Sequence, residues 1–185
     1  PISGGNMGAH GRTDPVTGER VHLSYQSTSR PFLRVDSFAK DWKLTSSVEV
    51  DVPSPVMVHD LAITENYVVI LDFPLTIRPL RMLTDSFPVE YEPQNGARIG
   101  LLPRGTNKDE TQWFDVENGV VLHTANAYER KDGTVVIHGF RSVPASADAS
   151  FIMDYTPPFL YEWVLDLSTG KTVSERCLNP DVVVE

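Results

Sequence analysis

The chain has 185 residues, of which 41% are hydrophobic, 9% aromatic and 22% charged, values that predict one globular domain with a sizeable core. Its formal net charge of −9, without a cluster of lysine and arginine, argues against nucleic acid as a partner and against an electrostatic hold on anionic lipid. The single cysteine, Cys177, excludes an intrachain disulfide, and no apolar run approaches the roughly 20 residues that span a bilayer.

The two ends of the chain resemble cuts through a longer protein. The sequence opens Pro1-Ile-Ser-Gly-Gly5 without an initiator Met or a secretory signal, and it stops in the apolar run Asp181–Glu185. We therefore expect a single incomplete domain over residues 1–185, truncated at both ends. Its open sheet edges would make the isolated chain prone to aggregate.

Short strands separated by turn signals follow one another from the N-terminus. Asp14–Gly18 predicts a tight turn, because its proline presets φ and its glycine can supply a positive φ. Apolar and polar residues then alternate over Val21–Tyr25, which predicts a half-buried strand with His22 on its polar, surface-facing side. Two further β-rich stretches, Phe32–Asp36 and Leu44–Val52, predict the next hairpin.

The segment Met57–Asp72 places a histidine just ahead of a β-branched run. Tyr67–Leu71 is apolar and rich in strand-forming residues, so it predicts a buried strand. His59 then lies at or just before the inner end of a hairpin. Rigid backbone at such a place suits a metal ligand or a catalytic base.

Residues 73–91 interrupt the strand pattern. Prolines at positions 74, 79 and 88 exclude a long helix here, although Leu80–Asp85 could form one or two helical turns. We interpret the stretch as an irregular excursion from the strand scaffold. It is either a segment that carries substrate contacts or an ordinary surface loop.

The rest of the chain continues the pattern of strands and turns. Asp132-Gly133 is a hairpin signal, and His138, in the predicted strand Val135–Phe140, is interpreted as structural. A stretch at 140–158 that is rich in Ser, Ala, Asp and Pro predicts a long loop. The other predicted strands share a β-rich or alternating composition; they are Arg98–Leu102, Gln112–Val116, Val120–Glu129, Phe159–Asp166 and Thr172–Cys177.

No segment shows a convincing helical period, so the chain is predicted to be nearly all-β. Repeated antiparallel hairpins of this kind are typical of a propeller or a sandwich. The hairpin units are too divergent to define a fixed repeat.

Three histidines share one local setting. His10, His59 and His123 each follow an apolar residue, and they stand 49 residues (10 to 59) and 64 residues (59 to 123) apart. A zinc finger needs close ligand pairs, so this spacing excludes one, whereas a propeller could supply one ligand per blade around its axis. Neutral imidazoles without thiolates suit iron, zinc, copper or nickel, and the residues alone leave the metal open.

Four stretches of the chain resemble the carotenoid cleavage oxygenases, and the resemblance covers essentially the whole sequence. They are Ala9–Glu19, Met57–Asn66, Arg98–Arg104 with Trp113-Phe114, and Leu122–Glu129. The second stretch is highly specific, and the order and gaps of the set add to the signal. One departure is Gly11, where the family usually has proline, so a looser turn is expected after His10.

The resemblance implies a seven-bladed β-propeller with a non-haem Fe(2+) on its axis, of which this chain would form about three blades. It implies His10, His59 and His123 as three of four histidine ligands. The fourth histidine, and the glutamates that orient the ligand imidazoles, would lie outside this segment; neither Glu65 nor Glu129 is assigned that role. No side chain is expected to act as an acid or base.

The activity implied by the resemblance is cleavage of a C=C double bond of a carotenoid or apocarotenoid with O2, giving aldehyde or ketone products. A polyene substrate needs an apolar tunnel, for which residues 73–91 are the candidate, and its insolubility makes peripheral membrane contact expected. The isolated segment, without a fourth ligand, is expected to bind iron poorly and to be inactive.

Two alternatives stay open. A stilbene-cleaving oxygenase of the same family would use the same centre on an aryl-substituted olefin. A non-catalytic β-propeller binding module would hold the same histidines as structural residues. The compartment is not assigned by the sequence, because family members include both plastid and cytosolic enzymes.

Overall fold

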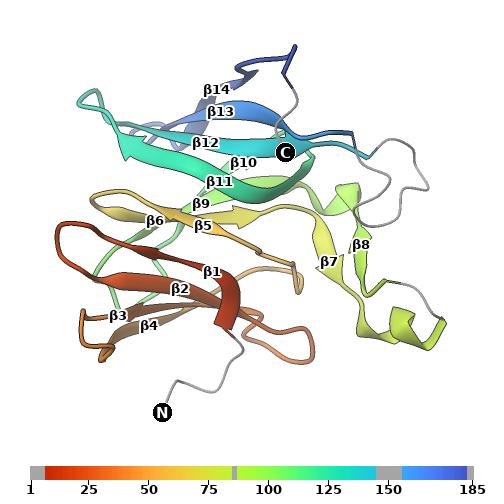
Figure 1. The fold of residues 1–185 in the computed structure, drawn as a ribbon, viewed down its shortest axis with the longest axis horizontal. Coiled ribbons are helices and arrows are strands. Elements are labelled where there is room, and N and C mark those ends of the chain that lie inside the picture. Colours follow the sequence, from red (N-terminus) through yellow and green to blue (C-terminus); the bar gives the residue numbers. More distant parts are fainter. Residues whose placement is uncertain (1–6, 85–86, 145–155, 183–185) are drawn as a thin grey trace.

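Nearly all the regular structure is β-strand in a computed structural model of the chain, which describes residues 7–84, 87–144 and 156–182. Three antiparallel sheets of four strands each are stacked one on another (Figure 1). The first blade consists of β1 (Met7–Thr13), β2 (Arg20–Tyr25), β3 (Leu33–Phe38) and β4 (Leu44–Val50), in that order.

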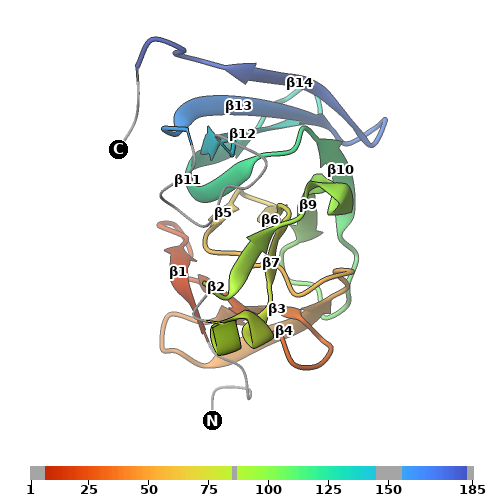
Figure 2. The same cartoon turned by 90° about the vertical axis from the view of Figure 1, so that its right-hand side faces the viewer.

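The second and third blades have the same four-stranded design. The second consists of β5 (Leu61–Ile63), β6 (Tyr67–Asp72), β9 (Ala97–Pro103) and β10 (Gln112–Val116). The third consists of β11 (Val120–Glu129), β12 (Thr134–Ser142), β13 (Phe159–Asp166) and β14 (Lys171–Cys177). The first strands of the blades, β1, β5 and β11, lie along one side of the stack (Figure 2), which confirms the prediction of an all-β chain forming about three propeller blades.

The seams between the blades are apolar, and the middle blade is buried on both faces. Val68 and Ile70 of β6 belong to the cluster that fills the seam with the first blade. Val69 and Leu71 belong to the cluster that fills the seam with the third blade, where Trp163 is fully buried. Because neighbouring side chains of a strand point to opposite faces, this two-sided burial explains why the predicted strand at Tyr67–Leu71 is apolar at every position.

The excursion at 73–91 is a small sheet and not an irregular loop. It contains β7 (Leu75–Ile77) paired with β8 (Val89–Tyr91), joined through the 3-10 helix η1 (Pro79–Thr84), where helical turns were expected. A second 3-10 helix, η2 (Pro93–Asn95), leads into β9. None of the helices within the described residues has the length and apolar character needed to cross a membrane.

One strand was not predicted from the sequence, and the start of one predicted loop is corrected. The sequence pattern does not predict β1, because this strand contains two glycines and little alternation. The loop expected at 140–158 starts later, since β12 continues to Ser142, and residues 145–155 of that loop lie outside the described residues.

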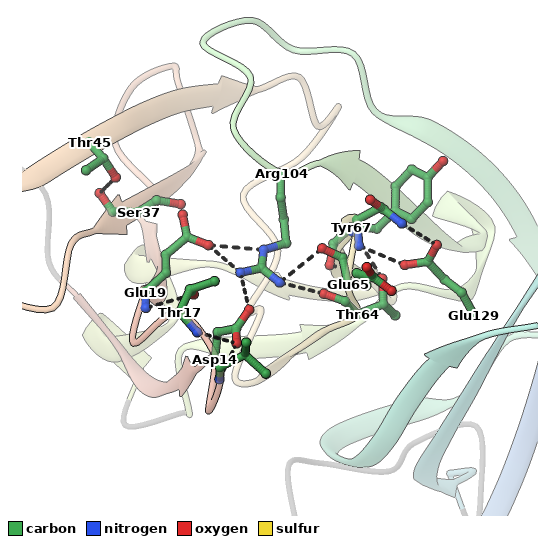
Figure 3. Close-up of polar contacts among 12 residues, drawn as sticks. Asp14, Thr17, Glu19, Ser37, Thr45, Thr64, Glu65, Tyr67, Arg104 and Glu129 are labelled. Carbon is green, nitrogen blue, oxygen red and sulfur yellow. Dashed lines mark hydrogen bonds and ion pairs between the residues drawn. The ribbon is translucent and has the colours of Figure 1, made fainter.

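Arg104 ties the first two blades together where their inner strands end (Figure 3). Its Nη2 lies 2.6 Å from Asp14 Oδ2 and 2.5 Å from Glu19 Oε2, both in the connection between β1 and β2. Its Nη1 donates hydrogen bonds to the carbonyl oxygens of Thr64 (2.7 Å) and Glu65 (3.2 Å), between β5 and β6. We call these five residues the Arg104 clamp.

The third blade reaches the same turn through Glu129, at the end of β11 (Figure 3). Its carboxylate accepts hydrogen bonds from the backbone N–H and the side-chain amide of Asn66, both at 2.8 Å. Asn66 follows two residues of the Arg104 clamp directly in sequence. All three blades therefore meet at the turn between β5 and β6.

Replacing Arg104 with methionine is expected to destabilise the protein by about 3 kcal/mol, the lower end of the range for a broken buried ion pair, because two partly buried carboxylates lose their cation. The free energy of unfolding in urea measures the loss. Arg34→Met is the matched control: Arg34 pairs with Glu49 at 2.7 Å, but the Glu49 side chain is 60% exposed. Its loss should stay within about 1 kcal/mol. Equal losses in the two variants would contradict a structural role for the clamp.

Acid should weaken the clamp through Asp14. Hydrogen bonds from Arg104 and from two backbone N–H groups of its own turn lower the pKa of Asp14 from 3.8 to about 2. A carboxyl group whose pKa falls on folding stabilises the fold above its unfolded pKa, and that contribution is lost as the pH falls through the folded pKa. Between pH 3.8 and about 2, wild-type protein should therefore lose more stability than Asp14→Asn. Thermal unfolding at several pH values tests this; parallel curves would disprove it.

Candidate metal centre

Three imidazoles from three different blades converge on one point. His10 lies on β1, His59 just before β5, and His123 on β11. The ring centroids are 4.9 Å apart for His10 and His59, and 5.1 Å apart for each of the two pairs that include His123. The rings thus form a nearly equilateral triangle, as three ligands on one face of a metal ion would.

Local backbone features orient the side chains of His59 and His123. Val56 and Val58 are buried, which anchors the extended segment that ends at His59. The pairing of β11 with β12 shifts register on both sides of Thr124, next to His123. Bulges of this kind commonly redirect a side chain beside a functional site.

The donor set suits a transition metal. One ring nitrogen from each histidine lies within 4.8 Å of the others, and among the described residues the group includes no Asp, Glu or Cys. His10 and His59 are half-buried and His123 is exposed, so the triangle remains open on one side. Metal–imidazole bonds are about 2.0–2.1 Å long, so small movements of the rings would bring all three nitrogens within bonding distance of a shared ion.

Electrostatics favour the neutral form of His59. Burial lowers its pKa, and the neighbouring His123 and His10 rings lower it further, against the opposing effect of the Asp60 carboxylate. A neutral imidazole has the free lone pair that a metal ligand needs.

The other two histidines lie elsewhere. His138 is on β12, with Nε2 3.1 Å from Glu162 Oε2, in agreement with its interpretation as structural. The expectation of a surface position for His22 is wrong, because its half-buried ring packs near Phe38 and Trp42.

The position of His22 also accounts for Gly11. A Cβ atom at position 11 would lie 2.2 Å from Cε1 of the His22 ring, so the ring would have to move from its place in this structure. Gly11 lies within β1, paired with His22, and not in the looser turn that the sequence suggested. The glycine therefore makes room for a ring on the neighbouring strand.

The small β7–β8 sheet packs against residues that lie close in sequence to two of the histidines. Leu75 and Val89 share a buried cluster with Val120, and Met57 and Leu122 pack against this cluster. Met57 precedes His59 by two residues, and Leu122 directly precedes His123. From this base η1 extends outward with three exposed apolar side chains, Leu80, Met82 and Leu83.

Sequence reasoning missed three polar residues next to the triangle. Asp60 is buried, and its carboxylate contacts Arg12 and Thr124. Each of the three lies within two positions of a predicted ligand. A charged residue inside an apolar segment, as at Asp60, is the signal that could have identified them.

Solved structures of two oxygenases share this fold. The lignostilbene dioxygenase of Pseudomonas brassicacearum superposes with a TM-score of 0.76 at 27% identity, over 90% of this chain and 37% of that one. A cobalt-substituted apocarotenoid oxygenase of Synechocystis superposes with a TM-score of 0.74 at 23% identity, over 94% of this chain and 39% of that one.

Sequence comparison points in the same direction. The carotenoid 9,10(9',10')-cleavage dioxygenase 1 of Pisum sativum is 37% identical over 136 residues, which cover 72% of this chain and 25% of that protein. The chain thus spans about a quarter of the length of this curated relative. A family model described as retinal pigment epithelial membrane protein, RPE65, matches residues 2–184. The chain therefore belongs to the RPE65 family, which includes the carotenoid cleavage oxygenases it resembles.

Proposed function

We propose that this chain supplies three blades, and three of the iron ligands, of a non-haem Fe(2+) dioxygenase that cleaves a C=C double bond of a carotenoid or apocarotenoid. The observation that carries the proposal is the convergence of His10, His59 and His123 from three separate blades. It is supported by family membership and by relatives named as carotenoid cleavage dioxygenases.

The three histidines would hold the ion through neutral ring nitrogens. Imidazole ligands suit Fe(2+), and the open side of the triangle leaves room for further ligands. Iron bound there would supply the electron chemistry that O2 requires. A fourth histidine, from outside residues 1–185, would complete the ligand set that the family resemblance implies.

The task of the remaining residues is to place an apolar substrate. The β7–β8 sheet packs against residues that adjoin His59 and His123, so an olefin guided along it would reach the triangle. The exposed Leu80, Met82 and Leu83 of η1 offer an apolar approach for a polyene, and a point of peripheral contact with a membrane in which the polyene is dissolved. We propose that residues 73–91 form part of the substrate path.

Stilbene cleavage is the second candidate function. It is supported by the likeness to the Pseudomonas lignostilbene dioxygenase, which has 27% identity to this chain. The same histidine triangle would serve an aryl-substituted olefin. The two functions therefore differ in the shape of the apolar path and not in the metal centre.

Metal binding tests the triangle directly. In the complete protein, with any sequence that flanks residues 1–185 in nature, His59→Ala should weaken Fe(2+) and Co(2+) binding by more than the roughly tenfold that loss of an outer-shell partner costs. Metal titration of the apoprotein measures the affinity. His138→Gln is the control, because its side chain lies on β12 and bonds Glu162. Unchanged affinity in His59→Ala would refute the proposed site.

Product analysis tests the reaction. The complete protein, loaded with Fe(2+) and supplied with O2, should convert a carotenoid or apocarotenoid into two carbonyl fragments, identified by chromatography and mass spectrometry. Fragments from stilbenes alone would select the second candidate. An iron-loaded protein that cleaves neither class of olefin would favour a non-catalytic binding module.

A further inference from the structure

A buried carboxylate links the three chain segments that carry the histidines. Asp60, whose side chain is 2% exposed, accepts a hydrogen bond on Oδ2 from Arg12 Nη2 at 2.6 Å. The same oxygen accepts bonds from the backbone N–H of Thr124 at 2.9 Å and from its hydroxyl at 3.0 Å. We call Arg12, Asp60 and Thr124 the Asp60 network.

The hydrogen bonding of the network is closed. Oδ1 of Asp60 accepts from the backbone N–H of Leu61 at 2.8 Å. The Thr124 hydroxyl accepts from Arg12 at 3.0 Å, and it can donate to Asp60 or to the Leu61 carbonyl at 2.9 Å. A buried carboxylate is stable only when its oxygens are satisfied in this way. Each member of the network therefore holds the others in place, whichever of the two acceptors the Thr124 hydroxyl uses.

Each member is connected to a histidine by one or two residues of backbone. Asp60 directly follows His59, Thr124 directly follows His123, and Arg12 lies two positions after His10. Fixing the three polar side chains against one another therefore fixes the three segments from which the imidazoles extend.

Backbone hydrogen bonds between strands do not fix these three segments relative to one another. The described strands β1, β5 and β11 pair with β2, β6 and β12, and no pairing joins them to one another. Apolar seams hold the blades together, but apolar contact has no preferred direction. Hydrogen bonds do have one, and they weaken steeply when misaligned.

The network adds little net charge beside the histidines. The Asp60 carboxylate and the Arg12 guanidinium form an ion pair, so their charges offset each other. Its influence on a bound cation should therefore act through geometry, and not through attraction.

From these contacts we propose that Asp60, with Arg12 and Thr124, is a positioning residue for the metal centre, holding the three imidazoles at the separation that one ion requires. This inference rests on the proposed function, because it assumes that the triangle binds metal. Asp60 itself does not contact the ion.

The test compares Asp60→Asn and Thr124→Val with wild type in the complete protein. Both substitutions keep the shape of the side chain and remove hydrogen-bonding capacity of the network. Asp60→Asn also removes the charge that offsets Arg12, whereas Thr124→Val changes no charge, so a loss in Thr124→Val reports on geometry alone. We expect Co(2+) affinity to fall by roughly tenfold or more in Asp60→Asn, the range seen when groups behind metal ligands are lost. Thr124→Val should lose less, and the double variant should lose no more than Asp60→Asn, since Thr124 acts through Asp60. The visible absorption bands of bound Co(2+) should shift as the ligand geometry relaxes.

Arg104→Met is the matched control, because the Arg104 clamp joins two of the same three blades without adjoining a histidine. It should lower stability while leaving the Co(2+) affinity and spectrum unchanged. An equal loss of affinity in Arg104→Met and Asp60→Asn would overturn the inference, because general loosening of the blades would then explain both.

The outcome also separates this inference from the proposed function. If wild-type protein binds Co(2+) through His59 but Asp60→Asn keeps its affinity and spectrum, the positioning role is wrong and the metal centre stands. If wild-type protein shows no His59-dependent binding, the proposed function itself is wrong. Should Asp60→Asn fail to fold, Thr124→Val decides alone, and an unchanged affinity and spectrum there would overturn the inference.

Discussion

The structure depends on contacts between side chains of different blades, because the inner strands belong to separate sheets. Within a blade, backbone hydrogen bonds fix neighbouring strands about 4.8 Å apart. Between blades there is no such ladder among the described strands. The histidines of the candidate metal centre come from three blades, so the geometry of that centre depends on contacts that involve side chains and not on a backbone ladder.

Two kinds of contact hold the blades together and align them. The apolar seams around β6 bring the blades together over a large area, and they supply most of the stabilisation. Polar contacts then fix the relative position of the inner strands at two levels, the Asp60 network and the Arg104 clamp. Removing either arginine would take the cation away from carboxylates that are buried or half-buried, which is why so few polar contacts can determine the alignment of whole sheets.

The sequence was sufficient for most of the strands, because alternation and β-branched composition are local properties. The histidine triangle could be predicted because its three members share a local setting and match a known family. The Asp60 network and the Arg104 clamp could not, since their partners across the blades lie 39 to 112 residues apart and no local pattern reports such contacts. β1 escaped notice because its glycines suppress the strand signal, and Gly11 is explained only by a ring on the adjacent strand.

The middle blade carries the β7–β8 sheet as an insertion, since β6 pairs directly with β9 across residues 73–96. The entropic cost of closing such a connection grows only with the logarithm of its length, by about 0.6 kcal/mol for each doubling. Evolution can therefore lengthen, shorten or rewrite this segment while the blade beneath it keeps its register. A propeller built in this way can change which ligands it recognises while the strand pairing of its blades is kept.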